Sequence, residues 1–226
     1  MPSVMNSAFI IVLFATFCTA LQQCPPPPNP PICQIEAFLC CDDNFHEELN
    51  LSAVCQNTAT FGDPWCARKA IESVFALGGS HGLLKVCSSF NTFNKCLGPT
   101  DLSCITVDFF VDHGIKRRFA QAYVGLIESL RYACGDGLNT YLQYGICMAQ
   151  VFSSAINKLQ KCQDDFYDNL NAEPQRACEF VNSASQCYQA PFASACGEEA
   201  GKWACAYERS ANLVFAPAGC SNTCAS

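Results

Sequence analysis

The chain has 226 residues, of which half are hydrophobic, 12% aromatic and 15% charged, and its formal net charge is −7. A chain this apolar and aromatic is too rich in core-forming residues to stay disordered. Because acidic residues outnumber basic ones, binding to nucleic acid or anionic lipid through net charge is not expected. The 19 cysteines lie at the lower edge of the compositions that are typical of disulfide-rich proteins.

The first segment, residues 1–20, contains no charged side chain, and residues 9–17 are apolar apart from Thr16. This run is too short to span a bilayer, and small residues follow it. The pattern predicts a secretory signal peptide that is cleaved between Ala20 and Leu21, with a buried N-terminal helix as the alternative. No later stretch is apolar over the length of a membrane span, so we predict no membrane anchor.

Residues 21–32 form a proline-rich segment in which most positions between Cys24 and Cys33 are proline. Such a stretch is extended, mostly as polyproline II, and the two flanking cysteines would tether it. We interpret it as a spacer. A ligand for a proline-reading domain is the alternative.

The number of cysteines indicates an oxidising compartment. Removal of Cys18 with the signal peptide leaves an even number, which could pair into as many as nine disulfides. A zinc site is disfavoured because the sequence has no Cys-x-x-Cys and only three scattered histidines, His46, His81 and His113. We predict no metal and no cofactor.

Two parts of the chain match each other around their cysteines. After Cys41 and after Cys162, Asp stands at the second position, Phe at the fourth and Leu at the eighth. The matched pairs are Cys33 with Cys147, Cys41 with Cys162, Cys87 with Cys178, Cys96 with Cys187, Cys104 with Cys196, and Cys134 with Cys220. This duplication predicts two divergent repeats, residues 33–135 and 136–226. Three bridges fit within each repeat, but which cysteines pair stays open.

The segments between the cysteines have helical periodicity. A single apolar stripe predicts a helix over residues 119–134, with Gly135 as its C-terminal cap. A longer helix is predicted over residues 138–159, with a break near Gly145, and Pro174 fits the first turn of another.

Helix geometry also bears on the bridges. Cys87 and Cys96 differ by nine positions, which places them on opposite sides of one helix, so each could bridge to a different neighbour. An insertion in the first repeat holds Cys55 and Cys66, which could bridge each other. No convincing strand is present. The predicted fold is all-α, with two divergent disulfide-stapled helical repeats after an extended proline-rich segment.

Residues 78–82 match the G-x-S-x-G pattern of a serine hydrolase, with Ser80 as the nucleophile. The required histidine would have to be His113, and the chain lacks the alternating strands and helices of that fold. The matched position in the second repeat is Asn171, and Asn and Ser share the role of capping a helix N-terminus. We therefore interpret Ser80 as a helix cap and keep the hydrolase as a remote alternative.

The segment around Cys40 and Cys41 is similar to secreted phospholipases with a His–Asp pair. In that family the histidine follows the cysteine pair by three residues, whereas His46 follows Cys41 by five. Tyr167 takes the matching place in the second repeat, so we reject this activity. Four acidic pairs are interpreted as solvated helix caps rather than cation ligands: Asp42–Asp43, Glu47–Glu48, Asp164–Asp165 and Glu198–Glu199.

Two surface signals remain. The sequence Asn50-Leu51-Ser52 is a standard N-glycosylation acceptor, so Asn50 is predicted to carry a glycan. Residues 116–118 are the one basic cluster, interpreted as a solvated helix start, with a processing or sulfated-glycan site as the alternative.

Residues 82–97, with Cys87, Cys96 and the following Cys104, resemble secreted nematode proteins that have a chondroitin-proteoglycan-type cysteine-rich helical domain, or the related nematode secreted domain of unknown function. The run from Cys178 to Cys196 looks like a diverged copy. The resemblance implies an extracellular helical fold without known catalytic residues. Chondroitin attachment is in doubt because the sequence has no Ser-Gly dipeptide.

These observations predict a secreted, non-enzymatic interaction or matrix protein whose partner is an unidentified extracellular protein or glycan. The alternative is a carrier of an apolar small molecule or lipid, because stapled helices rich in phenylalanine can enclose a cavity. The more common outcome is that the phenylalanines fill the core: Phe90, Phe93, Phe109, Phe110, Phe119 and Phe152.

Overall fold

A computed structural model describes residues 23–26, 32–56, 59–221 and 224, without the side chains of residues 101 and 102. Throughout this part of the chain the regular elements are helices and no strand occurs, so the all-α prediction is confirmed. None of these helices combines the length and apolar composition of a membrane span. The predicted signal peptide, its cleavage site at Ala20 and Leu21, and residues 27–31 of the proline-rich segment lie outside the described residues.

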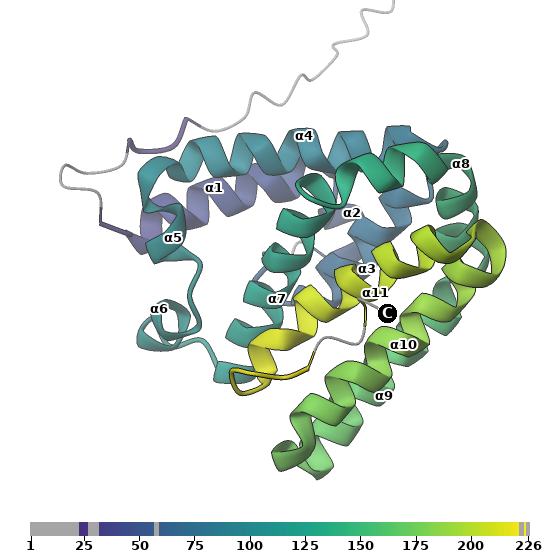
Figure 1. Cartoon of the computed structure of the whole chain (residues 1–226). Helices are drawn as coiled ribbons and strands as arrows, with labels where there is room; N and C mark the ends of the chain where they lie inside the picture. The colour runs from purple at the N-terminus through teal and green to yellow at the C-terminus, as the bar shows by residue number, and fades with distance from the viewer. Residues whose placement is uncertain (1–22, 27–31, 57–58, 222–223, 225–226) are drawn as a thin grey trace, which may run out of the picture.

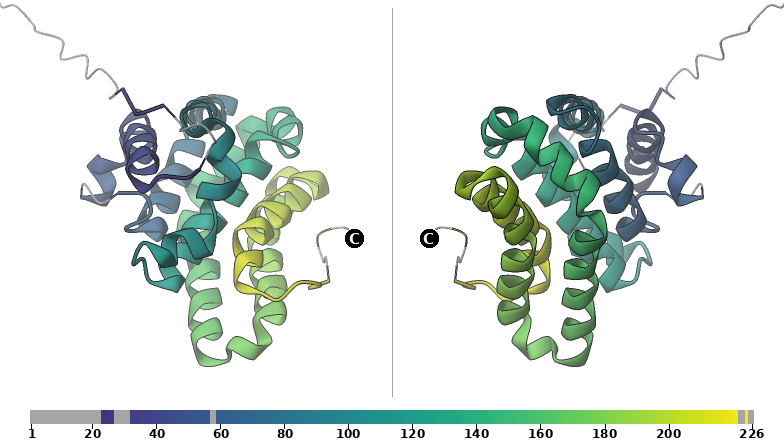
Figure 2. Two further views of the ribbon diagram at one scale, coloured as in Figure 1. Left: turned by 90° about the vertical axis from the view of Figure 1, so that its left-hand side faces the viewer. Right: turned by 90° about the vertical axis from the view of Figure 1, so that its right-hand side faces the viewer.

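The helices of the first half are α1 (Ile35–Glu48), α2 (Ser52–Cys55), α3 (Pro64–Phe75), α4 (Ser80–Leu97), α5 (Asp101–Cys104), α6 (Val107–Asp112) and α7 (Arg117–Cys134). The helices of the second half are α8 (Leu138–Ser154), α9 (Ile156–Ala172), α10 (Ala177–Cys196) and α11 (Glu198–Asn212). Helix α1 lies along α4, and α9 and α10 form a hairpin that projects from one end of the molecule (Figures 1 and 2).

Three bridges in each half join corresponding cysteines. In the first half they are Cys33–Cys104, Cys41–Cys96 and Cys87–Cys134. In the second half they are Cys147–Cys196, Cys162–Cys187 and Cys178–Cys220. Each bridge of the second half therefore connects the cysteines that the sequence pattern matches to one bridge of the first.

The other bridges are particular to one half. Cys55 and Cys66 join each other, as the insertion suggested, and the remaining pairs are Cys24–Cys40 and Cys205–Cys224. Every cysteine within the described residues is thus paired, and no bridge connects residues 33–135 with residues 136–226.

Among the described residues, the larger of two clusters of buried apolar residues extends through both halves, and the smaller lies between α9 and α10. Helix α11 packs against α7 of the first half, and Trp203 and Tyr207 of α11 are fully buried beside Phe75 and Tyr141. Most of the phenylalanines singled out above fill this core, since Phe90, Phe93, Phe110 and Phe152 are each at most 2% exposed. Phe109 and Phe119 are half-buried at its edge.

Two local predictions are wrong. The helix over residues 138–159 breaks at Ala155 rather than near Gly145. Gly145 lies inside α8 where that helix crosses the start of α4, and a Cβ at this position would overlap the Oγ of Ser80. Ser80 is the first residue of α4 and caps nothing with its side chain, because Gly79, at φ +68°, takes the N-cap position.

Candidate binding cleft

Trp65 is held at the start of α3 by three local features. The Asp63 carboxylate caps the helix by accepting a hydrogen bond from the Cys66 backbone N–H at 3.0 Å. Pro64 occupies the first turn, where its fixed φ suits a helix and its missing N–H is not needed. The Cys55–Cys66 bridge ties the same turn to α2. The half-buried Trp65 ring is therefore presented from a constrained turn.

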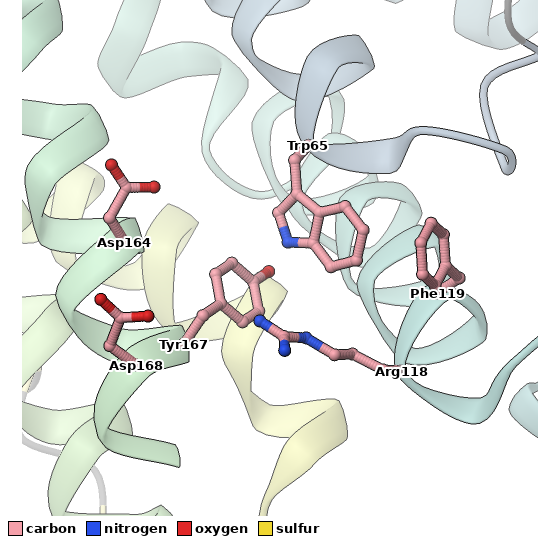
Figure 3. Close-up of a pocket in the computed structure, with 6 residues that line it drawn as sticks. All are labelled: Trp65, Arg118, Phe119, Asp164, Tyr167 and Asp168. Carbon is pink, nitrogen blue, oxygen red and sulfur yellow. The ribbon is translucent and has the colours of Figure 1, made fainter. Parts of the chain in front are cut away.

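Six residues from three helices line a cleft of about 540 Å³ next to this ring (Figure 3). They are Trp65 of α3, Arg118 and Phe119 of α7, and Asp164, Tyr167 and Asp168 of α9. The three α9 residues stand at spacings of three and four, which places them on one face of that helix. The cleft thus lies between helices of the first half and a helix of the second, and its volume is in the usual range for ligand sites.

The aromatic rings of the cleft meet nearly at right angles. Trp65 and Phe119 have ring centroids 4.8 Å apart at 80°, and Trp65 and Tyr167 have centroids 5.7 Å apart at 86°. Both are edge-to-face contacts, which aromatic quadrupoles favour. The Arg118 guanidinium carbon lies 5.6 Å from the centroids of both Trp65 and Tyr167. One positive group is therefore within cation–π distance of two rings.

The opposite rim of the cleft is acidic. Asp164 and Asp168 are exposed, and among the described residues neither carboxylate has an ion pair or a side-chain hydrogen bond. Their neighbour Asp165 is different, because it accepts a hydrogen bond from the Lys161 ammonium at 2.8 Å. Burial raises the pKa of Tyr167 to about 12, so its phenol is neutral at physiological pH.

A second opening of about 340 Å³ adjoins the first and shares Trp65 and Asp164 with it. Its remaining lining residues are Asp63, Cys66, Lys69, Gln160 and Gln163. Lys69 is exposed here, so the lining of this opening combines one ammonium group with the carboxylates of Asp63 and Asp164. The Trp65 ring stands between the two openings.

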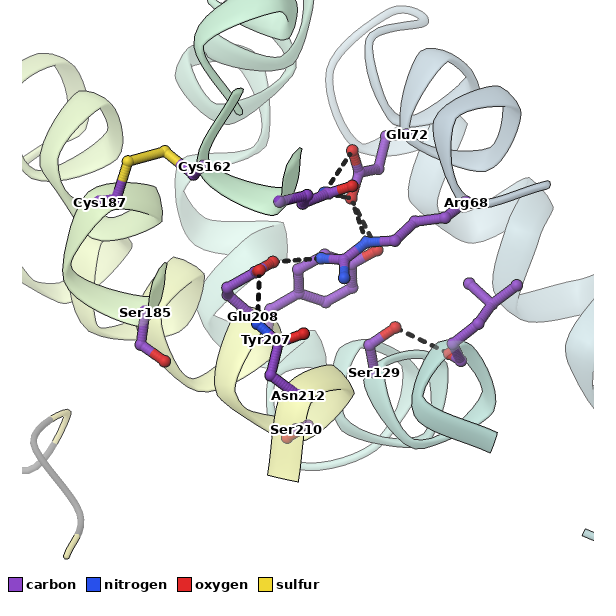
Figure 4. Close-up of polar contacts among 12 residues, drawn as sticks. Arg68, Glu72, Ser129, Cys162, Ser185, Cys187, Tyr207, Glu208, Ser210 and Asn212 are labelled. Carbon is purple, nitrogen blue, oxygen red and sulfur yellow. Dashed lines mark hydrogen bonds and ion pairs between the residues drawn. A yellow bond between two sulfur atoms is a disulfide. The ribbon is translucent and has the colours of Figure 1, made fainter. Parts of the chain in front are cut away.

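A buried ionic network (Figure 4) connects two helices that form the cleft, α3 and α9, and its Gln163 also lines the second opening. Arg68 of α3 donates from Nε to Glu72 at 2.9 Å and from Nη2 to Glu208 of α11. Gln163 of α9 donates to Glu72 at 3.3 Å, and Asn212 donates to Glu208 at 2.7 Å. All five residues are buried, and they connect α3 of the first half with α9 and α11 of the second.

The charges of this network do not balance, since one guanidinium faces two carboxylates. Burial raises the pKa of Glu208, which Arg68 partly counteracts. Burial alone would lower the pKa of Arg68, but Glu208 and Glu72 raise it well above its usual value. The cation therefore stays charged, and the network fixes the helix that carries Trp65 against the helix that carries Tyr167.

The serine hydrolase interpretation finds no support in the geometry. Ser80 lies beside an opening whose described lining comes from α8 and contains neither a histidine nor a carboxylate. His113 does not line this opening; it lies at the C-terminal end of α6, with its Nδ1 2.7 Å from the carbonyl oxygen of Phe109. His46 is buried on α1, whereas Tyr167, its match in the second repeat, lines the cleft.

The surface predictions have mixed outcomes. Asn50 is exposed in the turn after α1, with φ +54°, and its glycosylation stays a prediction. Residues 116–118 are an exposed helix start, as predicted, and Arg118 also lines the cleft. Among the acidic pairs, Glu198–Glu199 occupies the first turn of α11 as a cap would.

The cap interpretation is wrong for the other three pairs, which lie inside α1 and α9 rather than at helix starts. Asp42 is not solvated either. It is fully buried and accepts a hydrogen bond from the Tyr123 hydroxyl at 2.9 Å. The apolar residues around a helix position decide whether an acid is buried, and their arrangement here depends on contacts between distant helices.

Comparisons of the chain with protein-family models, with curated proteins and with solved structures find no match. The resemblance to nematode chondroitin-proteoglycan-type domains therefore stays a prediction.

Proposed function

We propose that this chain is a secreted, non-enzymatic binding protein that recognises an extracellular partner through the cleft between its two halves. The observation that carries the proposal is the convergence of Trp65, Arg118, Tyr167 and the two α9 carboxylates on one open cleft. Nine disulfides fit an oxidising extracellular compartment, in agreement with the predicted signal peptide.

The construction of the cleft favours binding over catalysis. Aromatic rings supply contact area at low entropic cost, and the rim supplies the few polar groups that orient a ligand. The disulfides and the buried network between α3 and α9 hold the walls of the cleft in place before a ligand arrives. Such preorganisation reduces the conformational entropy that binding removes.

The two tryptophans allow a direct test of this site. Trp65 lines the cleft, whereas Trp203 is 1% exposed in the core. In protein labelled at the indole nitrogen, we expect a ligand of the correct class to shift the Trp65 NMR signal and leave the Trp203 signal in place. The panel contains an organic cation, a neutral oligosaccharide and a sulfated oligosaccharide. The proposal fails if no class shifts Trp65, or if the protein has a hydrolytic activity that Ser80→Ala removes.

The carrier alternative has less support. The phenylalanines that would have to surround a bound lipid pack on other rings instead, as Phe38 does on Phe110 at 5.1 Å and Phe152 on Phe192 at 5.0 Å. One partly open cavity, which Phe38 and Cys41 help to line, measures about 10 Å³. This is room for at most a single water molecule.

A further inference from the structure

The cleft contains an aromatic corner that already holds a cation. Trp65 and Tyr167 meet nearly at right angles, and Phe119 closes the outer side of Trp65. The Arg118 guanidinium lies beside this pair of rings, with its carbon 5.6 Å from the centroid of each (Figure 3). Perpendicular rings that surround one positive group are the arrangement by which proteins recognise alkylated ammonium and guanidinium groups.

Arg118 is only loosely fixed in this position. The residue is exposed, and its one hydrogen bond to a described residue runs from Nη1 to Asn171 Oδ1 at 2.9 Å. No carboxylate of a described side chain lies within ion-pair distance of its guanidinium, in contrast to Arg117, which pairs with Asp108 at 3.3 Å. The side chain could therefore leave the rings without breaking a salt bridge.

The charges around the corner also favour a cation. Asp164 and Asp168 give the cleft two carboxylates against the single guanidinium of Arg118, and Lys69 faces the adjoining opening beyond Trp65. If Arg118 moved out, Trp65 and Tyr167 would border the vacated space, and the carboxylates of Asp164 and Asp168 would remain on the opposite rim of the same cleft. The whole chain adds a net charge of −7, which attracts cations over a longer range.

We infer that the cleft binds an organic cation, namely an alkylated ammonium or guanidinium group, and that Arg118 occupies the same place in the free protein as an internal competitor. This inference rests on the proposed function and gives the chemical class of its ligand. A cationic ligand displaces the Arg118 guanidinium from Trp65 and Tyr167 and gains the carboxylates of Asp164 and Asp168 as counter-charges.

The same geometry argues against the other ligand classes. A sugar needs an open ring face to stack on, but Arg118 lies over both Trp65 and Tyr167. A sulfated glycan would be attracted by Arg118 and repelled by the two α9 carboxylates. For a sulfated glycan Arg118 would be a required contact, whereas for a cation it is an obstacle. Removal of Arg118 therefore changes the affinity in opposite directions for a sulfated glycan and for a cation.

Choline is a suitable probe, and 3,3-dimethylbutan-1-ol is its neutral analogue of the same shape. Titrations at constant ionic strength follow the indole signals of the full secreted chain. We expect choline to shift the Trp65 signal saturably and the neutral analogue to have no comparable effect. The Trp203 signal reports in every sample that the core is intact.

The decisive variant is Arg118→Ala. Because two exposed cation–π contacts no longer compete, choline should bind about five- to thirtyfold more tightly. The matched control is Arg176→Ala, because Arg176 lies 5.3 Å from the centroid of the Phe180 ring but outside the cleft. This control should leave choline affinity unchanged.

A second pair of variants tests the carboxylates. Asp168→Asn should weaken choline binding about threefold, as expected for an exposed counter-charge. Asp165→Asn is the control on the same helix, since Asp165 pairs with Lys161 instead of facing the cleft. It should have a smaller effect than Asp168→Asn.

Three results would overturn the cation site. They are equal binding of choline and its neutral analogue, weaker choline binding in Arg118→Ala, and no choline binding to either form. If a sulfated oligosaccharide shifts Trp65 and Arg118→Ala abolishes that shift, the ligand class is wrong but the binding function stands. If no probe of any class shifts Trp65, the proposed function fails with it.

Discussion

Asp42 of α1 has a carboxyl side chain that is buried in the hydrophobic core. Its side chain is fully buried and accepts the Tyr123 hydrogen bond, and burial raises its pKa to about 7 from an ordinary value of 3.8. Because the folded-state pKa lies above the unfolded one, the folded protein holds this proton more tightly. The resulting stability is complete below about pH 4 and is lost as the pH rises towards about 7.

We predict that Asp42→Asn stabilises the protein at pH 8 and has little effect at pH 4. The neutral amide can still accept the Tyr123 hydrogen bond and needs no deprotonation, which should add about 1–4 kcal/mol to the free energy of unfolding at pH 8. Urea unfolding with intact bridges at several pH values measures this. The exposed neighbour provides the control Asp43→Asn. An equal gain at pH 4 and pH 8 would contradict the assignment.

Arg68 carries the only positive charge in the buried network of described residues. Replacement by methionine keeps the volume but leaves Glu72 and Glu208 buried without their cation. We predict that Arg68→Met lowers the free energy of unfolding by about 3–5 kcal/mol at neutral pH. Lys69→Met is the control, because Lys69 is exposed on the same turn. If both variants unfold at the same denaturant concentration, the network does not hold the halves together.

For individual residues, the sequence contains a partial signal for the buried network around Arg68. Arg68 and Glu72 are four positions apart in a stretch that is otherwise apolar at Ala67, Ile71 and Phe75, so charges on the buried face of a helix could be suspected. The partner Glu208 lies 140 residues away, and no local pattern connects it to Arg68. The aromatic corner escaped prediction for the same reason, because Trp65 and Tyr167 meet only in the folded chain.

The helices themselves were largely predictable from periodicity. The expected helix over residues 119–134 is α7, and Cys87 and Cys96 of α4 bridge to α7 and α1 on opposite sides, as the helical wheel required. The prediction of a helix break near Gly145 was wrong because a glycine within a helical pattern has two possible explanations. It can interrupt a helix, or it can admit a second helix at close range, and only the neighbour across the contact decides between them.

This contact at Gly145 gives a prediction for the packing of α8 against α4. Gly145→Ala should lower the free energy of unfolding by about 1–2 kcal/mol, since overlap with Ser80 outweighs the higher helix propensity of alanine. Ser80→Ala in the same chain removes the overlapping oxygen and should restore part of the loss. Exposed Gln143 of the same helix provides the control Gln143→Ala. Denaturant unfolding that shows no rescue would refute this explanation.

For the whole molecule, the duplication was visible in the cysteine spacing, but the shared core was not. Spacing reports which residues are equivalent in two repeats and carries no information on whether the repeats touch. The burial of Tyr207 beside Phe75 depends on how α11 docks on the first half. Contacts of this kind have no period in the sequence.

The intact mass of the secreted protein tests the covalent structure. We expect a chain that begins at Leu21, and a mass gain on reduction and alkylation that corresponds to nine bridges. Enzymatic deglycosylation should remove one glycan, and the Asn50→Gln chain should lack it. Free thiols in the native protein would contradict the prediction of an oxidising compartment. A glycan that persists in Asn50→Gln would contradict the prediction that Asn50 carries it.

The absence of any bridge between residues 33–135 and 136–226 has a topological consequence. Only the peptide link between α7 and α8 joins the halves covalently, so a protease that cut it would leave two internally cross-linked fragments. Their association would then depend on the shared core and the Arg68 network. Two polypeptides encoded separately should accordingly reassemble, and two intact copies could exchange halves. In architecture the protein is two divergent repeats that share a core and are joined covalently by a single peptide link.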